Sequence, residues 1–460
     1  MMDRNANNFI QEKQLLNDML MRHYFSKFQR GEGQIELFLT GACKANCDYC
    51  YLKKHQKGLY PVHLHNNDTI IKNLQMVLDW YIENNFTCYF DIFSAEWITT
   101  PLADRVIDTF VSTFEKVPSE KRPPLIAAAD NMQFLKSEEY TAKVESYIER
   151  LEALGIKFYL SASIDGKYCD YGRTENDDEY YKKLNDFMVK HKYRAHPMIS
   201  SDNIKYWIDN YLWWQENFDP SIANGIMTLE VRNETWDEES IGHLIRYCDF
   251  LSDYTFINNF KGNKLEFLKY VLDLPRSEEF AKNAPRSCYN SIGFNRVNIE
   301  DNMDYIGCTF HGAFPIRLGD LSIGLCHRTW YPELQVAQME VENDKIVGID
   351  PVNVALLLLK TRLTRTCLPH CENCKFVGVC PGHCLGASYE EYENLLVPQM
   401  EVCQMYQAKY SFLIHKYRKM GLFEELDKIR DKFNPEYFTY FKDLIDSVPQ
   451  FEERRSCCHE

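Results

Sequence analysis

The chain has 460 residues, of which 45% are hydrophobic and 14% aromatic, so it is long enough to bury a large core in more than one domain. The 52 Lys and Arg against 67 Asp and Glu give a net charge of −15, which argues against a general electrostatic attraction to nucleic acid or anionic lipid. No apolar run has the length of a membrane span, and the N-terminus lacks the apolar stretch of a secretory signal. We therefore expect a cytoplasmic protein with no nucleic-acid or membrane partner.

Residues 1–34 are predicted to form an N-terminal helical arm, because apolar residues recur there at helical spacing before Gly31 and Gly33. Strands and helices then alternate. Strands are predicted at 35–39, 88–93, 125–129, 158–164, 195–199 and 226–231, and helices from about 67, at 102–117, at 136–154, from about 178 and at 204–218. Such βα repeats imply an α/β fold with a parallel sheet, whose functional residues follow the C-terminal ends of the strands.

The rest of the chain changes character twice. The α/β core is predicted to span residues 35–235, and a helical bridge spans 236–300. Within 301–404 the content of Cys, Gly, Pro and His rises and helical periodicity fades, which favours a small fold held together by metal. Residues 405–460 return to helices and end in a charged tail.

The 17 Cys are unusual for a large cytoplasmic chain, where thiols stay reduced and clustered cysteines more often bind metal than form disulfides. Cys88, Cys169 and Cys248 are isolated in the sequence, and we expect them to be small core residues. Cys457 and Cys458 fall in the tail and are not expected to be ligands.

Three cysteines lie close together after the first predicted strand, as Cys43, Cys47 and Cys50. A single loop with this spacing can bind three corners of a cubane iron–sulfur cluster and leave the fourth iron open. A structural zinc site is the alternative, and it would need a fourth ligand such as His55 or His63.

The C-x3-C-x2-C spacing, with Tyr49 just before the third Cys, closely resembles the signature of radical SAM enzymes, and it lies in the loop where that family has it. The resemblance implies a partial (β/α)6 radical SAM barrel. It also implies a 4Fe-4S cluster that binds S-adenosyl-L-methionine (SAM), whose reductive cleavage gives a 5′-deoxyadenosyl radical that abstracts a substrate hydrogen. Tyr49 is then expected at the cofactor site.

Further cofactor-binding residues follow from this resemblance one at a time. Ser94-Ala95-Glu96 matches the Gly-Gly-Glu motif of the family, so Glu96 is expected to hold the SAM amino group, although both glycines are missing and Trp97 replaces the usual Pro. Ser163 matches the serine that contacts the ribose, with a strand-end cap as the alternative. Asn131 is expected to line the site. Arg173 is a candidate for the SAM carboxylate, with an ordinary surface arginine as the alternative.

A second cysteine constellation has the spacing C-x2-C-x5-C-x3-C and is preceded by two isolated cysteines. It resembles the SPASM extension that follows many radical SAM domains, and the two resemblances together cover residues 35–404. The upstream part departs from the pattern, since Gly319 lies six residues before Cys326 rather than four. Zinc ribbons are the alternative. The cysteines concerned are Cys308, Cys326, Cys371, Cys374, Cys380, Cys384 and Cys403.

The SPASM resemblance implies two auxiliary 4Fe-4S clusters. The outer cluster would be held by Cys371, Cys374, Cys380 and Cys403, and three irons of the inner cluster by Cys308, Cys326 and Cys384. Relatives with a complete inner set have a fourth Cys shortly after the first, near the place of Phe314 here. An open iron there could bind a substrate thiolate and lower its pKa. Alternatively, Cys288 or Cys367 would bind the fourth iron of the inner cluster.

His327 follows the second upstream cysteine, at the position where the sulfatase-maturing branch of the family has a catalytic Asp. This departure argues against formylglycine formation. His327 is our candidate proton acceptor, and a solvent-facing or structural histidine is the alternative.

The resemblance implies an anaerobic enzyme that matures a ribosomally made precursor peptide by forming a Cys-to-carbon thioether, as in sactipeptides or ranthipeptides. Carbon–carbon cyclophane-type cross-linking, epimerisation and formylglycine maturation are alternatives within the family, and an electron-carrying or metal-storage protein is the alternative outside it. The expected partners are the peptide and an electron donor such as ferredoxin or flavodoxin. Only 42 residues precede Cys43, too few for the usual peptide-recognition domain, so we expect the arm, the C-terminal helices or a separate protein to bind the leader.

Overall fold

The computed structural model describes residues 15, 18, 22–39, 41, 43, 45, 47–54, 67–170, 174–232, 234–283, 291–294, 312–363 and 368–449. The chain forms two compact units. The first comprises Met1–Pro197 and Cys308–Leu363, and the second comprises Met198–Gly307 and Thr364–Glu460. The cysteine-rich segment 301–404 therefore contributes residues to both units.

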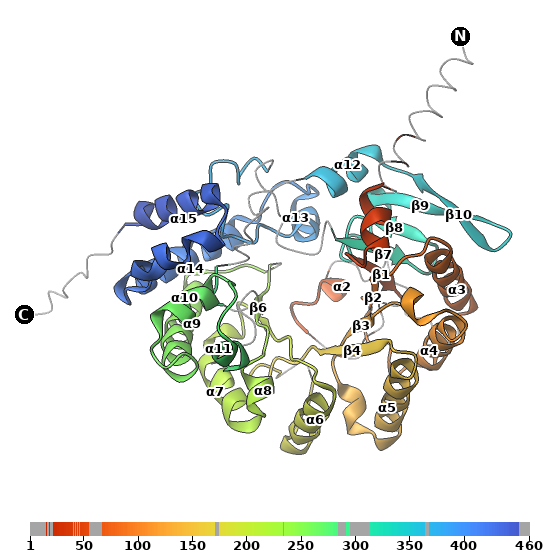
Figure 1. Ribbon diagram of the computed structural model, residues 1–460, viewed down its shortest axis with the longest axis horizontal. Helices are drawn as coiled ribbons and strands as arrows, with labels where there is room; N and C mark the ends of the chain where they lie inside the picture. The colour runs from red at the N-terminus through yellow and green to blue at the C-terminus, as the bar shows by residue number, and fades with distance from the viewer. Residues whose placement is uncertain are drawn as a thin grey trace, which may run out of the picture. The chain divides into compact units, whose positions relative to one another are not determined.

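The first unit is built on an eight-stranded sheet in the order β10-β9-β8-β7-β1-β2-β3-β4 (Figure 1). Strands β7, β1, β2, β3 and β4 run parallel, and β8, β9 and β10 are added antiparallel. The strands are β1 (Gln34–Phe38), β2 (Tyr89–Ile92), β3 (Leu125–Asp130), β4 (Lys157–Ala162), β7 (Ala313–Arg317), β8 (Ser322–Gly324), β9 (Gln335–Glu342) and β10 (Lys345–Pro351).

The helices of this unit are α2 (Tyr51–Lys54), α3 (Asp68–Glu83), α4 (Pro101–Phe114), α5 (Glu138–Glu152), α6 (Asp178–His191) and α12 (Val354–Arg362), with short 3₁₀ turns at Ser119–Lys121, Gln133–Lys136 and Pro332–Leu334. Asn67 caps α3 by accepting hydrogen bonds from the first helical N–H groups. Helices α3 and α4 bury their apolar faces on the sheet, where Tyr81, Phe110 and Phe114 surround Phe90. This aromatic core holds the helices against one face of the sheet.

The opposite face of the sheet carries two acidic residues. The register places Glu36, Asp91, Ala127 and Tyr159 side by side across β1 to β4. Alternate residues of a strand point to opposite faces, so Glu36 and Asp91 lie on the face away from Phe90. Both carboxylates therefore lie on the face of the sheet opposite the layer of α3 and α4.

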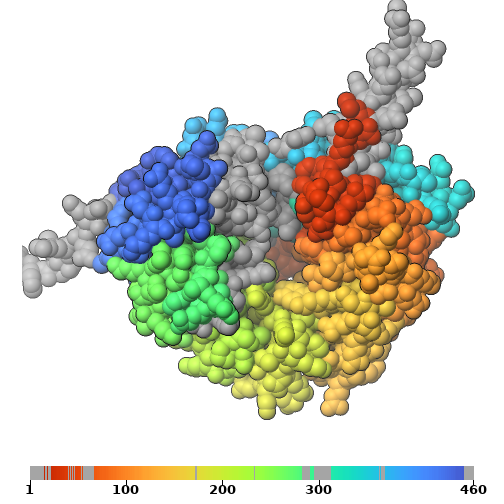
Figure 2. Space-filling model, in the orientation of Figure 1, coloured from red at the N-terminus to blue at the C-terminus, as the bar shows by residue number. Residues whose placement is uncertain are grey.

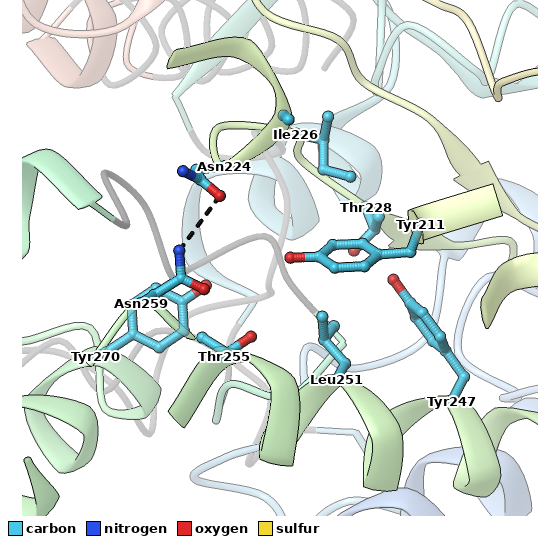
Figure 3. Close-up of a pocket in the computed structure, with 10 residues that line it drawn as sticks. Tyr211, Asn224, Ile226, Thr228, Tyr247, Leu251, Thr255, Asn259 and Tyr270 are labelled. Atoms are coloured by element: carbon cyan, nitrogen blue, oxygen red, sulfur yellow. Dashed lines mark hydrogen bonds between the residues drawn. The ribbon is translucent and has the colours of Figure 1, made fainter. Parts of the chain in front are cut away.

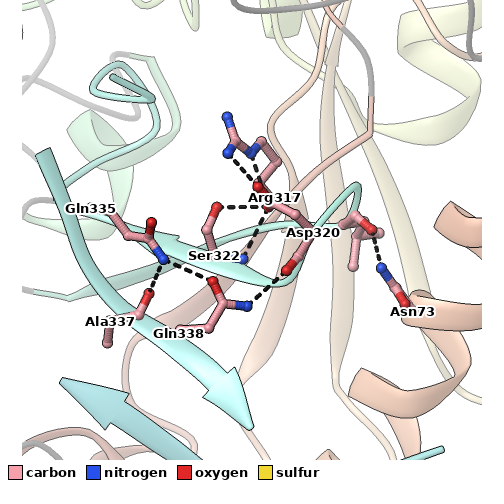
Figure 4. A network of polar contacts seen from close by, with 8 residues as sticks. Asn73, Arg317, Asp320, Ser322, Gln335, Ala337 and Gln338 are labelled. Carbon is pink, nitrogen blue, oxygen red and sulfur yellow. Dashed lines mark hydrogen bonds and ion pairs between the residues drawn. The ribbon is translucent and has the colours of Figure 1, made fainter. Parts of the chain in front are cut away.

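The turn between β7 and β8 is held by a polar network (Figure 4). Asp320 pairs with Arg317 and accepts hydrogen bonds from the backbone N–H and the hydroxyl of Ser322, at 3.1 and 2.8 Å. Asn73 on α3 donates to the carbonyl of Leu318 at 2.6 Å, and Gln338 on β9 donates to the carbonyl of Asp320 at 2.8 Å. No strands are predicted here from the sequence, yet β7 to β10 extend the central sheet.

The second unit is mainly helical. Its elements are β5 (Met198–Ile199), α7 (Trp207–Asn217), α8 (Pro220–Ala223), β6 (Leu229–Glu230), α9 (Glu238–Asn258), α10 (Lys264–Val271), α11 (Glu278–Asn283), α13 (Leu385–Tyr392), α14 (Met400–Lys419) and α15 (Pro435–Ser447), with 3₁₀ turns at Ile204–Tyr206 and Leu422–Lys432. Strands β5 and β6 pair in parallel. Helix α14 packs along α9, and the green and blue parts of this unit adjoin in Figure 2.

A cavity of about 30 Å³ lies in the second unit between α7, α9 and the start of β6 (Figure 3). Its wall carries the hydroxyl groups of Tyr211, Thr228 and Thr255, and Asn259 donates a hydrogen bond to Asn224 at 3.2 Å. The volume and the polar wall suit one or two ordered waters. We therefore interpret this cavity as internal hydration.

The predicted elements of the first half of the chain are present with small shifts of their ends, and strands β5 and β6 are shorter than predicted. Helix residues 22–29 end before Gly31 and Gly33, which both have left-handed φ angles near 75°. Cys88, Cys169 and Cys248 are buried, which confirms them as core residues. Among the described residues, none of the helices is long and apolar enough to cross a membrane.

Candidate functional site

Four predicted site segments follow four adjacent parallel strands. The loop with Cys43, Cys47 and Cys50 follows β1, Glu96 follows β2, Asn131 follows β3 and Ser163 follows β4. Because parallel strands end at a common edge, these segments meet at the C-terminal edge of the sheet. The sequence-based prediction of their shared location is therefore consistent with the strand order.

The loop after β1 is in contact with the segment after β2. Burial raises the pKa of the Cys43 thiol, and the backbone groups of Ala45 and Glu96 and the thiol of Cys50 are near enough to shift this pKa. A turn closes the loop, with the Cys50 N–H donating to the Cys47 carbonyl at 3.2 Å. Among these residues Cys43 is exposed, and Cys47 and Cys50 are partly exposed.

A cavity of about 390 Å³ opens beside this loop. This volume is in the range of small-molecule sites, which usually combine an apolar lining with a few placed polar groups. The described residues that line it come from the cysteine loop, the segments after β2, β3 and β4, and α5. They are Ala45, Glu96, Thr99, Asn131, Gln133, Phe134, Tyr140, Thr174 and Glu175.

Two of the predicted cofactor residues lie in this cavity. Glu96 is 9% exposed and accepts a hydrogen bond of 2.9 Å from the Thr99 hydroxyl. Asn131 is 8% exposed, and its side-chain oxygen accepts from the N–H of Gln133 at 3.1 Å. Ser163 is not among the described lining residues, and its N–H donates to the Asp130 carbonyl at 2.8 Å. Thr99 and Gln133 therefore orient the two predicted ligands.

Tyrosines on either side of Cys50 fix the loop to other segments. The Tyr49 hydroxyl donates to Asp165 at 2.7 Å. The Tyr51 hydroxyl donates to the His327 carbonyl at 3.4 Å, and the Arg328 guanidinium lies 4.7 Å from the centre of the Tyr51 ring. The cysteine loop and the His327 segment are therefore in contact within the first unit.

His327 itself stacks on Phe93, which directly follows β2, with 3.8 Å between ring centroids. Its Nδ1 lies 3.4 Å from the carboxylate of Glu36, which also accepts a hydrogen bond from Gln34 at 2.5 Å. Burial would raise the pKa of Glu36, but His327 and the nearby Lys360 hold this pKa below its ordinary value. The ring of the predicted proton acceptor is thus oriented by a buried carboxylate.

The structure also brings together part of the second predicted cysteine site. A cavity of about 50 Å³ in the second unit is lined by four of the predicted ligands, Cys371, Cys374, Cys380 and Cys403, together with His370, His383 and Tyr406. The N–H of Gly382 donates to the Cys380 sulfur at 3.4 Å. Cys384 is not among the lining residues and is the N-terminal cap residue of α13.

The four thiols surround this cavity. Burial, and then the neighbouring Cys380, Cys371 and Cys374, raise the pKa of Cys403 to about 12. Thiols in this environment need a bound metal to stay ionised. Among the residues that the structure describes, no three His, Cys, Asp or Glu side chains come close enough to bind one metal ion.

The remaining predicted ligands belong to different units or lie outside the described residues. Cys326 is in the first unit, where the Thr329 hydroxyl lies 3.6 Å from its sulfur, and Cys384 is in the second. Cys308 and Arg173 lie outside the described residues, as do the alternative ligands His55, His63, Cys288 and Cys367 and the terminal pair Cys457 and Cys458. The inner-cluster assignment stays a prediction.

Sequence reasoning missed several polar residues at these sites. Thr99 is three residues after Glu96 and Gln133 is two after Asn131, so proximity to a predicted ligand was an available signal. Asp165 is likewise two residues after Ser163, but its contact with Tyr49 spans 116 positions. Tyr140 and Glu36 lie far in sequence from the residues they accompany, and nothing in a single sequence indicates their contacts. His383 was also missed, although it directly precedes Cys384.

Comparison with known proteins shows the fold. No protein family and no curated protein sequence matches the chain. Native anSMEcpe with bound AdoMet matches with a TM-score of 0.52 at 13% identity, over 84% of this chain and 98% of that chain. The histidine-tagged form of anSMEcpe with bound AdoMet matches with a TM-score of 0.51 at 13% identity, covering 89% and 98%. SuiB of Streptococcus suis bound to S-adenosylmethionine has a TM-score of 0.44 at 16% identity, covering 86% and 80%.

The likeness to anSMEcpe and the mixed helix and strand content confirm the predicted fold class, an α/β partial barrel with additional parts. At this identity the likeness concerns the fold. What the chain does has to be argued from its own residues.

Proposed function

We propose that this protein is a radical SAM enzyme that modifies a ribosomally made precursor peptide. The observation that carries the proposal is the cavity of about 390 Å³ in which Ala45 of the cysteine loop meets Glu96 and Asn131. A loop of three thiols beside a cavity with a carboxylate and an amide provides the donors that a cluster and an amino-acid-like cofactor require.

The residues present fit these groups. Cys43, Cys47 and Cys50 would hold a 4Fe-4S cluster, Glu96 would accept hydrogen bonds from the SAM amino group, and Asn131 would contact SAM. When bound, the cluster and SAM supply a 5′-deoxyadenosyl radical that abstracts hydrogen from the substrate. The chain's own part is to orient SAM through Glu96 and to exclude water from the cavity.

Cys371, Cys374, Cys380 and Cys403 would hold an auxiliary 4Fe-4S cluster. The cavity that these four cysteines line together supports this assignment, and a zinc site is the alternative. The inner cluster, with Cys308, Cys326 and Cys384, is proposed on the sequence pattern.

The reaction we propose is formation of a thioether between a peptide Cys sulfur and a carbon, which removes two hydrogens per cross-link. The 5′-deoxyadenosyl radical would take the hydrogen atom from carbon, His327 would take the thiol proton, and the remaining electron would pass to the proposed auxiliary cluster. His327 is the proposed proton acceptor, because Glu36 holds its Nδ1 and Phe93 holds its ring at the edge where β2 ends. Carbon–carbon cross-linking, epimerisation and formylglycine formation are the alternatives that the product would reveal. Ferredoxin or flavodoxin is the proposed electron donor.

The test is a reaction with the anaerobically reconstituted full chain, SAM, a reductant and a cysteine-rich peptide encoded beside this gene. We expect 5′-deoxyadenosine and a peptide that is lighter by two hydrogens and has lost an alkylatable thiol. A mass loss with all thiols retained would indicate a carbon–carbon bond. The triple variant Cys43/Cys47/Cys50→Ala should release no 5′-deoxyadenosine, and retained cleavage would refute the proposal.

A second variant distinguishes the role of the proposed SAM site from that of the proposed inner cluster. Cys384→Ala should still cleave SAM, because Cys384 is not among the described residues that line the cavity beside the Cys43 loop, but it should give no cross-linked peptide. Normal product formation by Cys384→Ala would show that the inner-cluster assignment is wrong.

A further inference from the structure

Asp165 is a buried carboxylate that makes contact with the cysteine loop. It is fully buried, and it accepts a hydrogen bond of 2.7 Å from the hydroxyl of Tyr49, 116 positions earlier in the chain. A hydroxyl that donates to a carboxylate makes a strong, charge-assisted bond. Burial increases the importance of this bond, since a desolvated carboxylate is costly without donors.

A polar network fixes Asp165 in turn. The carboxylate of Asp170 accepts from the N–H groups of Asp165 and Gly166, at 3.0 and 3.3 Å, and also from the Tyr181 hydroxyl at 3.2 Å. Asp170 is 2% exposed. The segment that follows Ser163 is therefore held rigidly from within, and Asp165 offers a fixed acceptor to Tyr49.

The bond acts on the three thiols through the backbone. Tyr49 lies between Cys47 and Cys50, whose backbone groups close a turn at 3.2 Å. Fixing the Tyr49 side chain limits the conformations that this turn can adopt, and so limits where the two sulfurs can lie. On the other side of Cys50, the Tyr51 ring is held by Arg328 and by the His327 carbonyl.

We propose that Asp165 is a positioning residue for the cluster and SAM. Through Tyr49 it preorganises the loop of Cys43, Cys47 and Cys50 and joins this loop to the segment of Ser163. The inference rests on the proposed function, since it assumes that the loop holds a cluster. Preorganisation of this kind strengthens binding because less conformational entropy is lost when the ligand binds.

The test measures SAM binding without turnover. The full chain is reconstituted with iron and sulfide under anaerobic conditions, and the SAM dissociation constant is measured by equilibrium dialysis with no reductant present. We compare Tyr49→Phe, Asp165→Ala and the double variant with the wild type. Tyr193→Phe is the matched control, because it removes another buried hydroxyl, which donates to the Phe158 carbonyl on β4.

We expect each single variant to raise the SAM dissociation constant about tenfold. The dissociation constant of the double variant should be no higher than that of the weaker-binding single variant. Tyr193→Phe should bind SAM as the wild type does. Faster loss of iron to a chelator should accompany the change. Binding within twofold of the wild type for Tyr49→Phe would overturn the inference, as would additive losses in the double variant.

Thermal unfolding of the metal-free chain separates positioning from general stability. A purely structural role would lower the melting temperature and leave SAM binding by the folded fraction unchanged, which would also overturn the inference. If Asp165→Ala does not fold, the SAM dissociation constant of Tyr49→Phe alone tests the inference, because this variant keeps the aromatic ring. A wild type that binds no SAM would instead refute the proposed function, so the two failures are distinguishable.

Discussion

Lys409 on α14 donates a hydrogen bond of 2.6 Å to Glu230 on β6, and their side chains are 0% and 4% exposed. The rings of Tyr406 and Tyr410 lie 5.7 and 5.6 Å from the Lys409 ammonium. Burial disfavours the charge of Glu230, but Lys409 holds the pKa of Glu230 below its ordinary value. This ion pair joins β6 to the helix that carries Cys403.

Removal of one partner of this pair should destabilise the second unit strongly. Lys409→Ala would leave Glu230 buried without its counter-charge, at a cost of about 3 to 5 kcal/mol in the free energy of unfolding. Replacement of both residues, as Glu230→Leu with Lys409→Met, should recover most of this loss. Urea unfolding of the metal-free chain measures each difference.

An exposed ion pair in the same unit provides the control. Lys261 and Glu279 are 3.2 Å apart, with side chains 67% and 63% exposed, so Lys261→Ala should cost less than about 1 kcal/mol. Equal losses for Lys409→Ala and Lys261→Ala would contradict the assignment of Glu230 and Lys409 as a buried pair.

Asp91 should make the stability of the first unit depend on pH. Burial, and then the adjacent Glu36, raise the pKa of Asp91 from 3.8 to about 8. The folded state therefore binds this proton more tightly than the unfolded state, so its stabilising contribution is complete below pH 3.8 and is lost as the pH rises through about 8.

Asp91→Asn mimics the protonated carboxyl. The free energy of unfolding of Asp91→Asn, relative to the wild type, should therefore increase steadily between about pH 4 and pH 8. Urea unfolding at several pH values measures it, with the exposed Asp202→Asn as the control. A difference that does not vary with pH would show that Asp91 is ionised in the folded chain.

The sequence predicted those elements whose apolar pattern is regular. Strands β1 to β4 are apolar runs with Ile35, Phe90, Ile126 and Phe158 buried at matching positions. Strands β7 to β10 were missed for physical reasons. Pro315 interrupts the strand pattern of β7, β8 has three residues, and register shifts occur at Gly324 and Gly348.

The residues of the candidate site also divide into those that the sequence predicts and those that it does not. Local spacing indicates Cys43, Cys47 and Cys50, since a short loop brings them together whatever the fold. The bond between Tyr49 and Asp165 spans 116 residues, and the stacking of His327 on Phe93 depends on a strand order that interleaves distant segments. Contacts of this kind arise from the tertiary fold and leave no periodic signal in one sequence.

Gly378 is required by the packing of Tyr440 on the loop between Cys374 and Cys380. Its N–H donates to the Tyr440 hydroxyl at 2.9 Å, and that hydroxyl donates to the Lys375 carbonyl at 2.6 Å. A Cβ atom on Gly378 would lie 2.7 Å from Cζ of the Tyr440 ring, which is too close for any real contact.

Gly378→Ala should displace the Tyr440 ring or the loop and cost about 1 to 3 kcal/mol of stability. Because the loop carries two thiols of the proposed outer cluster, iron bound per chain should also fall after reconstitution. Gly319→Ala is the matched control, since a Cβ there meets no atom within 4 Å. Full iron content in Gly378→Ala would argue against a cluster in this loop.

Glu96 should contribute to SAM affinity through its charge. It is a 9% exposed carboxylate whose Oε1 accepts a hydrogen bond of 2.9 Å from Thr99, and its backbone contacts the Cys43 sulfur. Glu96→Gln keeps the size and the backbone but removes the charge, so SAM binding should weaken by about tenfold or more while iron content stays unchanged. Thr99→Val should weaken binding less, because it only releases the Glu96 side chain. Equilibrium dialysis with the exposed Glu115→Gln as control tests both, and an unchanged dissociation constant for Glu96→Gln would exclude Glu96 as the SAM ligand.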